Sequence, residues 1–306
     1  MRVKVRAYCS SANLGPGFDV LAVALDAFYD EVQVEVVREK GVRLVEVTGP
    51  YAKHVGEPCT AVEAAKNVLS MLGANVGLEV RLWKGVPVGK GLGSSGASAA
   101  AAALATSLAL GKKLDAESLV EAAGKAEGVI AGSPHYDNVS ASLLGGLVMV
   151  LHGDRPKPIK LGEPSATFLL AVPDVEVPPK KTGLMRKVLP RRVALADYVR
   201  NASRLAALIA GMVKGDFALA GLGMEDCIVE RARAPYVPGY QPVRAAALSA
   251  GALGVALSGA GPSVLILAPK DKVESIVKEV KRQYASMGIG VKLIVTRTAP
   301  AAHGVS

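Results

Sequence analysis

A glycine-rich loop followed by serines is the strongest chemical signal in the sequence. Gly89, Gly91 and Gly93 lie within five residues, and Ser94 and Ser95 come directly after them. The small residues that follow predict a helix that begins at the loop. The start of a helix offers unpaired backbone N–H groups and the positive end of the helix dipole, and glycines allow phosphate oxygens to approach the backbone. The loop therefore predicts a phosphate site.

Two common phosphate-binding motifs fit this loop only in part. A Walker-type loop needs four residues between its glycines and a serine or threonine after its lysine, whereas Gly91 follows Lys90. The stretch from Gly91 to Gly96 has the G-x-G-x-x-G spacing of a dinucleotide site. That motif requires a strand after its helix, however, and residues 114–128 predict a second helix. A nicotinamide-dependent dehydrogenase stays open as an alternative, which titration with NADH would test.

Length and composition indicate two domains with a full hydrophobic core. The chain has 306 residues, of which 50% are hydrophobic. The net charge of +9 comes from scattered basic residues, and only 4% of the residues are aromatic, which leaves few side chains for stacking on bases. This pattern favours an anionic small molecule over nucleic acid as the partner, with a nucleic-acid-binding module as an open alternative.

The cysteines and the longest apolar stretch bear on the cellular compartment. Cys9, Cys59 and Cys227 lie far apart without metal-like spacing, which argues against a disulfide framework and favours a reducing environment. The first residues show no signal-peptide pattern, and residues 97–110 are too few and too weakly apolar to cross a bilayer. We therefore expect a cytoplasmic protein that does not interact with a membrane.

Hydrophobic periodicity divides the chain into two halves. In the first half, alternating or β-branched stretches predict strands over residues 3–8, 30–37, 42–47, 78–83 and 147–152. Helical spacing predicts helices over 60–72 and 114–128, with Thr60 and Asp115 as N-caps and Gly128 at the end of the second. The prolines and glycines of 153–165 predict a linker. Beyond it, the pattern predicts an α+β layer in which helices pack against a small antiparallel sheet.

Four motifs in the same order resemble those of the GHMP small-molecule kinases. Residues 87–101, PVGKGLGSSGASAAA, resemble the family signature P-x-x-x-G-L-G-S-S-A-A, with Gly96 where alanine is usual. Residues 256–267, ALSGAGPSVLIL, resemble the C-terminal glycine motif of the family. Two other stretches resemble motifs of the homoserine kinases within this family: SSANLGPGFDVLAVAL (10–25) and SPHYDNVSASLLGG (133–146). Together the motifs extend over nearly the whole chain.

The resemblance implies a fold and an activity. The fold would be the two-domain α+β GHMP kinase fold, with an ATP-binding domain over 1–158 that is similar to a ribosomal-protein domain, and a ferredoxin-like α/β layer over 159–306. The activity would be the ATP-dependent phosphorylation of L-homoserine to O-phospho-L-homoserine in threonine biosynthesis. Mg²⁺ would be the cofactor beside ATP, and the chain would form a homodimer. A mevalonate or shikimate type of GHMP kinase is the alternative.

The resemblance also assigns roles to individual residues. For the phosphates of ATP it implies Lys84, Pro87, Gly91, Leu92, Gly93, Ser94 and Ser95. For the metal ion it implies Ser95 and Glu127, and for catalysis these two residues with Asp137 and Asn138. For the acceptor it implies Asn13, Asp19, His135, Asp137, Thr182, Arg186, Arg233 and Gly259. Whether any residue acts as a general base stays open, as do the adenine contacts, because Cys59 stands where the family has asparagine.

The chemistry of homoserine agrees with the residue types that the resemblance implies for the acceptor. The guanidinium groups of Arg186 and Arg233 suit a carboxylate, because they offer paired donors and keep their charge in proteins. The carboxylates of Asp19 and Asp137 suit an amine. Together these side chains would select a zwitterion, whereas mevalonate has no amine.

Overall fold

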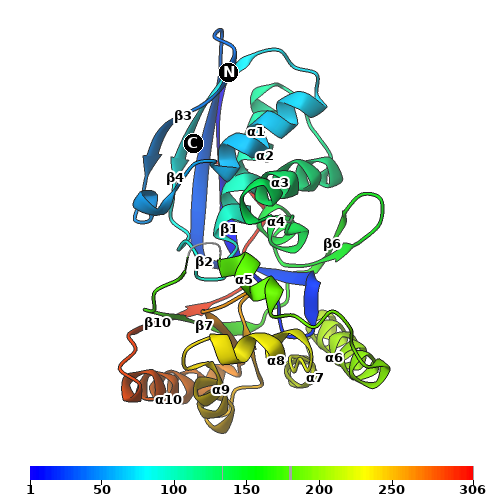
Figure 1. Cartoon of the computed structure of the whole chain (residues 1–306), viewed down its shortest axis with the longest axis vertical. Helices are drawn as coiled ribbons and strands as arrows, with labels where there is room; N and C mark the ends of the chain where they lie inside the picture. Colours follow the sequence, from blue (N-terminus) through cyan, green and yellow to red (C-terminus); the bar gives the residue numbers. More distant parts are fainter. Residues whose placement is uncertain (133, 179–180, 306) are drawn as a thin grey trace.

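The computed structural model describes residues 1–132, 134–178 and 181–305. Residue 133, the first of the quoted stretch 133–146, lies outside the described residues. The described chain forms two sheets, each with its own helices, one above the other in Figure 1.

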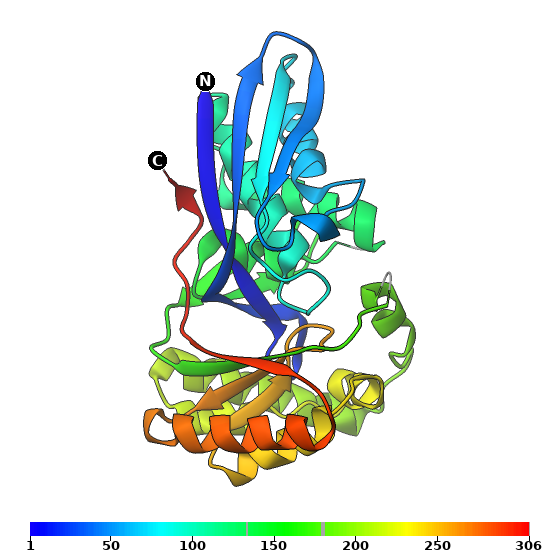
Figure 2. The ribbon, with the colours of Figure 1, turned by 90° about the vertical axis from the view of Figure 1, so that its left-hand side faces the viewer.

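The first sheet has seven strands built around one very long strand. Its members are β1 (Arg2–Asn13), β2 (Gly17–Val37), β3 (Gly41–Thr48), β4 (Gly77–Trp83), β5 (Leu147–Leu151), β6 (Lys157–Gly162) and β11 (His303–Gly304). The main order is β11-β1-β2-β4-β3, and β5 pairs with both β2 and β6. The second half of β2 pairs with β4, whereas its first half pairs with β5. The hairpin of β1 and β2 therefore extends beyond the rest of the sheet towards the second half of the molecule (Figure 2).

Four helices cover one face of this sheet: α1 (Thr60–Met71), α2 (Ser94–Ala109), α3 (Ala116–Ala131) and α4 (Tyr136–Leu144). The predicted N-cap Asp115 is confirmed, because its carboxylate accepts a hydrogen bond from the backbone N–H of Ser118. The prediction for Thr60 is wrong: Cys59 is the N-cap of α1, and the Thr60 hydroxyl donates instead to the carbonyl of Ser95. Gly128 does not end α3, which continues to the left-handed Gly132.

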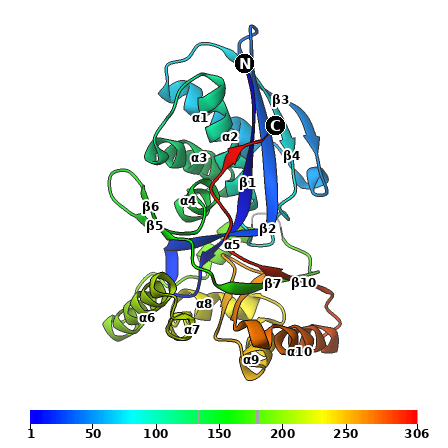
Figure 3. The same cartoon turned by 180° about the vertical axis from the view of Figure 1, so that it is seen from behind.

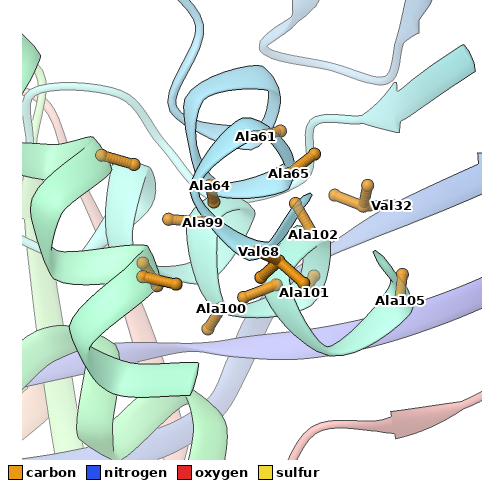
Figure 4. Close-up of a cluster of buried hydrophobic side chains, with 14 of the residues drawn as sticks. Val32, Ala61, Ala64, Ala65, Val68, Ala99, Ala100, Ala101, Ala102 and Ala105 are labelled. Atoms are coloured by element: carbon orange, nitrogen blue, oxygen red, sulfur yellow. The ribbon is translucent and has the colours of Figure 1, made fainter. Parts of the chain in front are cut away.

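The alanine-rich helix α2 is the centre of this layer. Its side chains are almost all buried, and Figure 4 shows Ala99 and Ala102 facing Ala64 and Ala65 of α1. Small side chains on both helices let the two backbones pack closely, and burial of these methyl groups stabilises the contact. No helix in the described part of the chain is long and apolar enough to cross a membrane.

The second sheet is small and wholly antiparallel, as the sequence predicts. It consists of β7 (Thr167–Pro173), β8 (Gly254–Leu257), β9 (Val264–Ala268) and β10 (Val291–Thr296) in the order β10-β7-β9-β8. The remaining helices belong to this half: α5 (Lys181–Lys187), α6 (Leu195–Lys214), α7 (Phe217–Gly223), α8 (Val229–Arg233), α9 (Tyr240–Ser249) and α10 (Val273–Ser286). Helices α9 and α10 pack on one face of the sheet, around Tyr284.

The other face of the second sheet shares a hydrophobic core with the first half. This core joins Phe168 and Leu265 of the second sheet to Leu21 of β2 and Leu92 of the glycine-rich loop. The short helices η1 (Ala52–His54), η2 (Ala234–Tyr236) and η3 (Lys270–Lys272) lie in connections between the larger elements. Because the loop belongs to the shared core, the fold holds it where the two halves meet.

The connection between the halves differs from the expected linker. Residues 153–165 contain β6, which pairs with β5 and so belongs to the first sheet. The predicted boundary between residues 158 and 159 falls within this strand. The chain also returns at its end: β11 pairs with β1, as the red segment in Figures 2 and 3 shows. Only two residues of β11 are paired, too few to give a periodic signal.

Candidate active site

The glycine-rich loop connects β4 to α2, and its glycines are required by close contacts. Gly89, Gly91 and Gly93 all have positive φ angles, of 75°, 78° and 61°. A Cβ atom on Gly91 would lie 2.2 Å from the carbonyl oxygen of Ser258, and one on Gly93 would lie 2.1 Å from Oγ of Ser10. Each glycine thus allows another segment to approach the loop, and no other residue fits these positions without strain.

The first residues of α2 have the features of an anion-binding helix start. Gly93 is the N-cap, and no side chain caps the helix, so the helix start stays available to a ligand. The hydroxyl of Ser94 donates to the carbonyl of Val86 at 3.0 Å, which closes the loop on itself. Pro87 is buried in the same turn, and Leu92 is anchored in the shared core, where its carbonyl accepts from the backbone N–H of Ser10.

Lys84 supports the loop from beneath. Its side chain is buried, and its ammonium pairs with Asp30 and donates to the carbonyl of Ser94 at 2.7 Å. The other oxygen of Asp30 accepts from the backbone N–H groups of Gly85 and Val86, both at 2.9 Å. The ammonium group is therefore engaged in holding the start of α2, and the structure gives Lys84 a role in positioning the loop.

Ser95 and Glu127 meet at the mouth of the loop. The Ser95 hydroxyl donates to Oε1 of Glu127 at 2.5 Å, and only 3% of Glu127 is exposed. The other oxygen, Oε2, lies 3.4 Å from Nδ1 of His135 but accepts no hydrogen bond from any described residue. Burial lowers the pKa of His135, but the neighbouring carboxylate of Glu127 outweighs this effect, and the pKa of His135 is raised.

This pair of oxygens fits a magnesium ion. A buried carboxylate oxygen that accepts no hydrogen bond is costly, and a divalent cation beside it would offset that cost. The described residues contain no cluster of three or more His, Cys, Asp or Glu side chains that would bind a metal by themselves. Mg²⁺ takes only one or two protein ligands when phosphates supply the others, so Ser95 and Glu127 are a sufficient set.

Asp137 and Asn138 at the start of α4 lie beside the loop. Oδ1 of Asn138 accepts from the Ser10 hydroxyl at 3.0 Å, on the segment that contacts Gly93. Oδ1 of Asp137 accepts from the backbone N–H of Asn138 at 2.7 Å. Burial, followed by the negative charge of Asp19, raises the pKa of Asp137 to about 6. A carboxylate with such a pKa is ionised at neutral pH but poorly solvated, which makes it a good hydrogen-bond acceptor for a hydroxyl or an amine.

The turn between β1 and β2 brings Asn13 and Asp19 to the second half of the chain. Both residues have positive φ angles, 75° and 58°, which non-glycine residues rarely adopt. The Asn13 amide donates to the carbonyl of Gly259 in the C-terminal glycine motif at 3.1 Å. Both carboxylate oxygens of Asp19 accept from Nη2 of Arg186, at 2.9 Å each. These contacts join four of the residues predicted for the acceptor.

Arg233 completes this group. It is 3% exposed and donates to the carbonyls of Gly259 and Met185, both at 3.2 Å. Burial lowers the pKa of Arg233 to about 10. The ring of Phe18 lies 5.3 Å from the guanidinium carbon of Arg186 and 5.1 Å from that of Arg233. An aromatic face attracts cations, so Phe18 offsets the repulsion between the two arginines. Thr182 lies on α5, one turn before Arg186.

Two hollows lie near these residues. A small one is lined by Asn13, Arg233 and Gly259 together with Asp226 and Glu230, so it is part of the arginine group. A larger one, of about 380 Å³, lies between the connection from α5 to α6 and the helix α8. Cys227 and Arg231 line it, but none of the predicted site residues does.

Comparisons with known proteins identify the family. A family model for the N-terminal domain of GHMP kinases matches residues 60–146, and a model for the C-terminal domain of GHMP kinases matches residues 208–286. The chain belongs to the GHMP kinase family. The predicted fold class, the two-domain α+β GHMP kinase fold, is therefore confirmed.

Among the relatives of this GHMP kinase, several are named homoserine kinase. The protein of that name from Aeropyrum pernix is 50% identical over 89% of this chain and 88% of its own length. The one from Pyrobaculum neutrophilum is 43% identical over 97% of this chain and 99% of its own. A crystal structure of homoserine kinase from Cytophaga hutchinsonii superposes with a TM-score of 0.90 at 34% identity, covering 99% of this chain and 97% of that one. The mevalonate kinase of L. major, with a TM-score of 0.71 and 19% identity over 97% of this chain and 96% of that one, shares the fold.

The GHMP kinase site also contains residues that the sequence did not single out. Asp30, Ser98, Ser10 and Phe18 all bind or position predicted residues. Ser10 and Phe18 lie inside the quoted N-terminal motif, so the motif could have indicated them. Asp30 lies in the middle of a strand, where a buried acid can be found only once its partner Lys84 is known to face it.

Proposed function

We propose that this GHMP kinase is a homoserine kinase, which transfers the γ-phosphoryl group of ATP to the side-chain hydroxyl of L-homoserine and forms O-phospho-L-homoserine for threonine biosynthesis. The observation that supports this most strongly is the pairing of Asp19 with Arg186 beside Arg233 and Asn13. Arg233 and Asn13 both donate to the carbonyl of Gly259, and the residue before it, Ser258, donates to the glycine loop at Gly91. Relatives named homoserine kinase match nearly the full chain at 40–50% identity, which supports the same substrate.

The phosphates of ATP would lie in the loop from Gly91 to Ser95. The backbone N–H groups at the start of α2 would hydrogen-bond phosphate oxygens, and Lys84 would keep these groups in place from below. Ser95 and Glu127 would bind Mg²⁺ through their side-chain oxygens. When bound, the ion would neutralise the negative charge that develops on the transferred group.

The acceptor would lie where β1, β2, α4, α5 and α8 meet. Its carboxylate would be held by the guanidinium groups of Arg186 and Arg233, and its amine by Asp19 or Asp137. Asn13 and Gly259 would position the backbone around it, and His135 and Thr182 would line its edges. In this arrangement the free amino acid replaces part of the ion pair between Asp19 and Arg186.

Asp137 would accept a hydrogen bond from the reacting hydroxyl. The hydroxyl oxygen forms a bond to the γ-phosphorus, the bond from this phosphorus to the bridging oxygen of ADP breaks, and the hydroxyl proton leaves towards the ionised carboxylate or water. Asn138 holds Asp137 in position through its backbone N–H and its side-chain amide. Most of the acceleration would come from positioning and from stabilisation of charge, as is general for phosphoryl transfer.

An acceptor screen tests the proposal directly. ADP release would be followed with homoserine, mevalonate, shikimate and galactose, each at several concentrations, and the phosphorylated product would be identified by mass spectrometry. We expect release with homoserine alone and a product that contains one added phosphoryl group. Turnover of mevalonate or shikimate in place of homoserine would assign another GHMP kinase activity, and NADH binding without ATP use would assign a dehydrogenase.

The homodimer and the cytoplasmic location belong to the same proposal. Three free cysteines suit a reducing compartment. On α6 the exposed apolar side chains of Leu195, Tyr198 and Val199 follow helical spacing, which suits contact with a second copy. Light scattering of the purified protein would measure the mass, and a monomer at micromolar concentration would contradict the dimer.

A further inference from the structure

A buried lysine at the start of α5 binds two glycine loops at once. Lys181 is only 8% exposed. Its ammonium donates to the carbonyl of Gly89 at 2.7 Å and also to the carbonyl of Gly261. Gly89 belongs to the phosphate loop and Gly261 to the C-terminal glycine motif, so one side chain connects the two halves of the molecule at the nucleotide site. Figure 1 shows α5 at this junction.

The two loops also contact each other directly. The Ser258 hydroxyl donates to the carbonyl of Gly91 at 2.7 Å, and the backbone N–H of Ser263 donates to the carbonyl of Lys90 at 3.2 Å. The loops thus form one double layer whose edge is closed by Lys181. The carbonyl oxygens of Gly89 and Gly261 carry partial negative charge, and without a cation they would repel the phosphates of a nucleotide.

Within the described ranges, no carboxylate pairs with the ammonium of Lys181. Burial lowers the pKa of Lys181 to about 7, and the positive charges of Arg233 on α8 and Lys90 on the loop act in the same direction. A buried ammonium without a counterion is costly, whereas a polyanion nearby would favour its charged form.

We propose that Lys181 is a positioning residue of the nucleotide site, which holds the two glycine loops together and supplies positive charge to the edge of the phosphate loop. This inference rests on the proposed function. It adds a residue from the second half of the chain to a site that the glycine signature places in the first half. It also distinguishes the two ends of α5, since Lys181 serves the nucleotide and Arg186 serves the acceptor.

Two variants separate the hydrogen bonds from the charge. Lys181→Met removes both, whereas Lys181→Gln keeps a donor and loses the charge. Lys187→Met is the matched control, because Lys187 is exposed at the other end of the same helix. Isothermal titration with a non-hydrolysable ATP analogue should show Kd raised about tenfold to hundredfold in Lys181→Met, less in Lys181→Gln, and within about twofold in the control. KM for homoserine should change by less than about threefold in all three.

Proton uptake gives a readout that a purely structural lysine would not change. Burial lowers the pKa of Lys181, and the phosphates of the analogue should raise it again, so that binding at pH 8 should drive proton uptake by this residue. Titration in two buffers of different ionisation enthalpy would measure this uptake. We expect net proton uptake in the wild type and in Lys187→Met, and a clear loss of this uptake in Lys181→Met.

Several outcomes would overturn the inference. One is a folded Lys181→Met protein with wild-type Kd and wild-type proton uptake. If both variants fail to fold, hydrogen exchange of the wild type decides: the analogue should slow exchange in 89–93, 181–187 and 258–263 together, and an unchanged 181–187 segment would overturn the proposal. If the wild type binds the analogue but Lys181 is dispensable, only this inference fails. If the wild type binds no analogue, the proposed kinase function fails instead.

Discussion

The buried carboxylate of Asp137 is expected to lower the stability of the folded protein at neutral pH and to accept a hydrogen bond from the reacting hydroxyl. The variant Asp137→Asn tests both effects. The Asp137 side chain is only 2% exposed, and its pKa is raised from 3.8 to about 6, first by burial and then by Asp19. Asparagine has nearly the same shape and keeps an oxygen that can accept from the N–H of Asn138. The variant therefore removes the charge and little else.

The magnitude and the pH range follow from this shift. The unfolded chain ionises Asp137 near pH 3.8 and the folded protein only near pH 6, so ionisation favours the unfolded state. The penalty is absent below about pH 3.8, grows between there and about pH 6, and is complete above it. A shift of about two units corresponds to roughly 3 kcal/mol. The free energy of unfolding of Asp137→Asn, measured relative to wild type, should thus be higher at pH 7.5 than at pH 4 by up to about 3 kcal/mol.

Urea unfolding at the two pH values measures the free energy of unfolding, and steady-state kinetics measures the effect on homoserine turnover. Homoserine turnover should fall about a hundredfold in Asp137→Asn, and wild-type kcat/KM for homoserine should decline below about pH 6. Asp154→Asn, at an exposed turn, is the control and should show neither change. An equal stability difference at both pH values would refute the raised pKa, and near-normal turnover would remove Asp137 from the reaction.

Three further predictions concern the other parts of the site. Arg186→Ala and Arg233→Ala should each lower kcat/KM for homoserine about thirtyfold or more, because each removes a proposed partner of the acceptor carboxylate. ATP affinity should change little, as kinetics with the two substrates varied separately would measure. Glu127→Gln should lower turnover about a hundredfold and recover in part at high Mg²⁺ in a titration of activity against metal, because the amide is a weaker ligand. Lys84→Met should lower the free energy of unfolding by about 3–5 kcal/mol in urea, because it leaves Asp30 buried without its cation.

Each of these variants has a control of the same residue type at a more exposed position. Arg191→Ala should leave kcat/KM for homoserine within about twofold, and Glu121→Gln should leave turnover within about twofold. Lys66→Met should change the free energy of unfolding by less than about 0.5 kcal/mol, because these side chains are exposed or partly exposed. Loss of ATP affinity with retained homoserine affinity in the arginine variants would reassign them to the phosphates. Normal turnover of Glu127→Gln at low Mg²⁺ would remove it from the metal site, and an unchanged unfolding energy of Lys84→Met would show that the buried pair is not stabilising.

The sequence predicts the parts of the fold and the site that depend on local pattern. The glycine spacing places the start of α2, since this signal lies within a few consecutive residues. Alternating or β-branched stretches predict β1, β3, β4, β5 and the second half of β2, but not the first half of β2, β6 or β11. The resemblance also indicates residues from distant segments that meet in the fold, namely Asn13, Asp19, Arg186, Arg233 and Gly259. It does so because each motif fixes the position of its residues within its own segment. The roles of these individual residues remain predictions until the variants are measured.

Other features depend on residues that meet only in the folded chain. Lys84 is predicted to bind the phosphates, but its ammonium pairs with Asp30, and the sequence does not show that the residue after β4 lies beside Asp30 of β2. Thr60 has the residue type of an N-cap, yet its hydroxyl finds a better partner in the carbonyl of Ser95 on the neighbouring helix. Lys181 stands beside a proline-rich loop like an ordinary surface lysine, and only its contact with two distant glycine loops reveals its position.

The return of the chain to its first strand determines when folding can finish. Residues at the end of β1 pair with β2 early in synthesis, but the outer edge of β1 waits for β11, with Val5 opposite Gly304. The backbone N–H of Ala299 also donates to the carbonyl of Ala24, so residues synthesised long after β2 connect the two halves. Contacts of such high sequence separation form slowly, because a long loop must close first. During translation the long hairpin therefore stays incompletely covered, and the nascent chain should need protection from aggregation until β11 has been synthesised and has paired with β1.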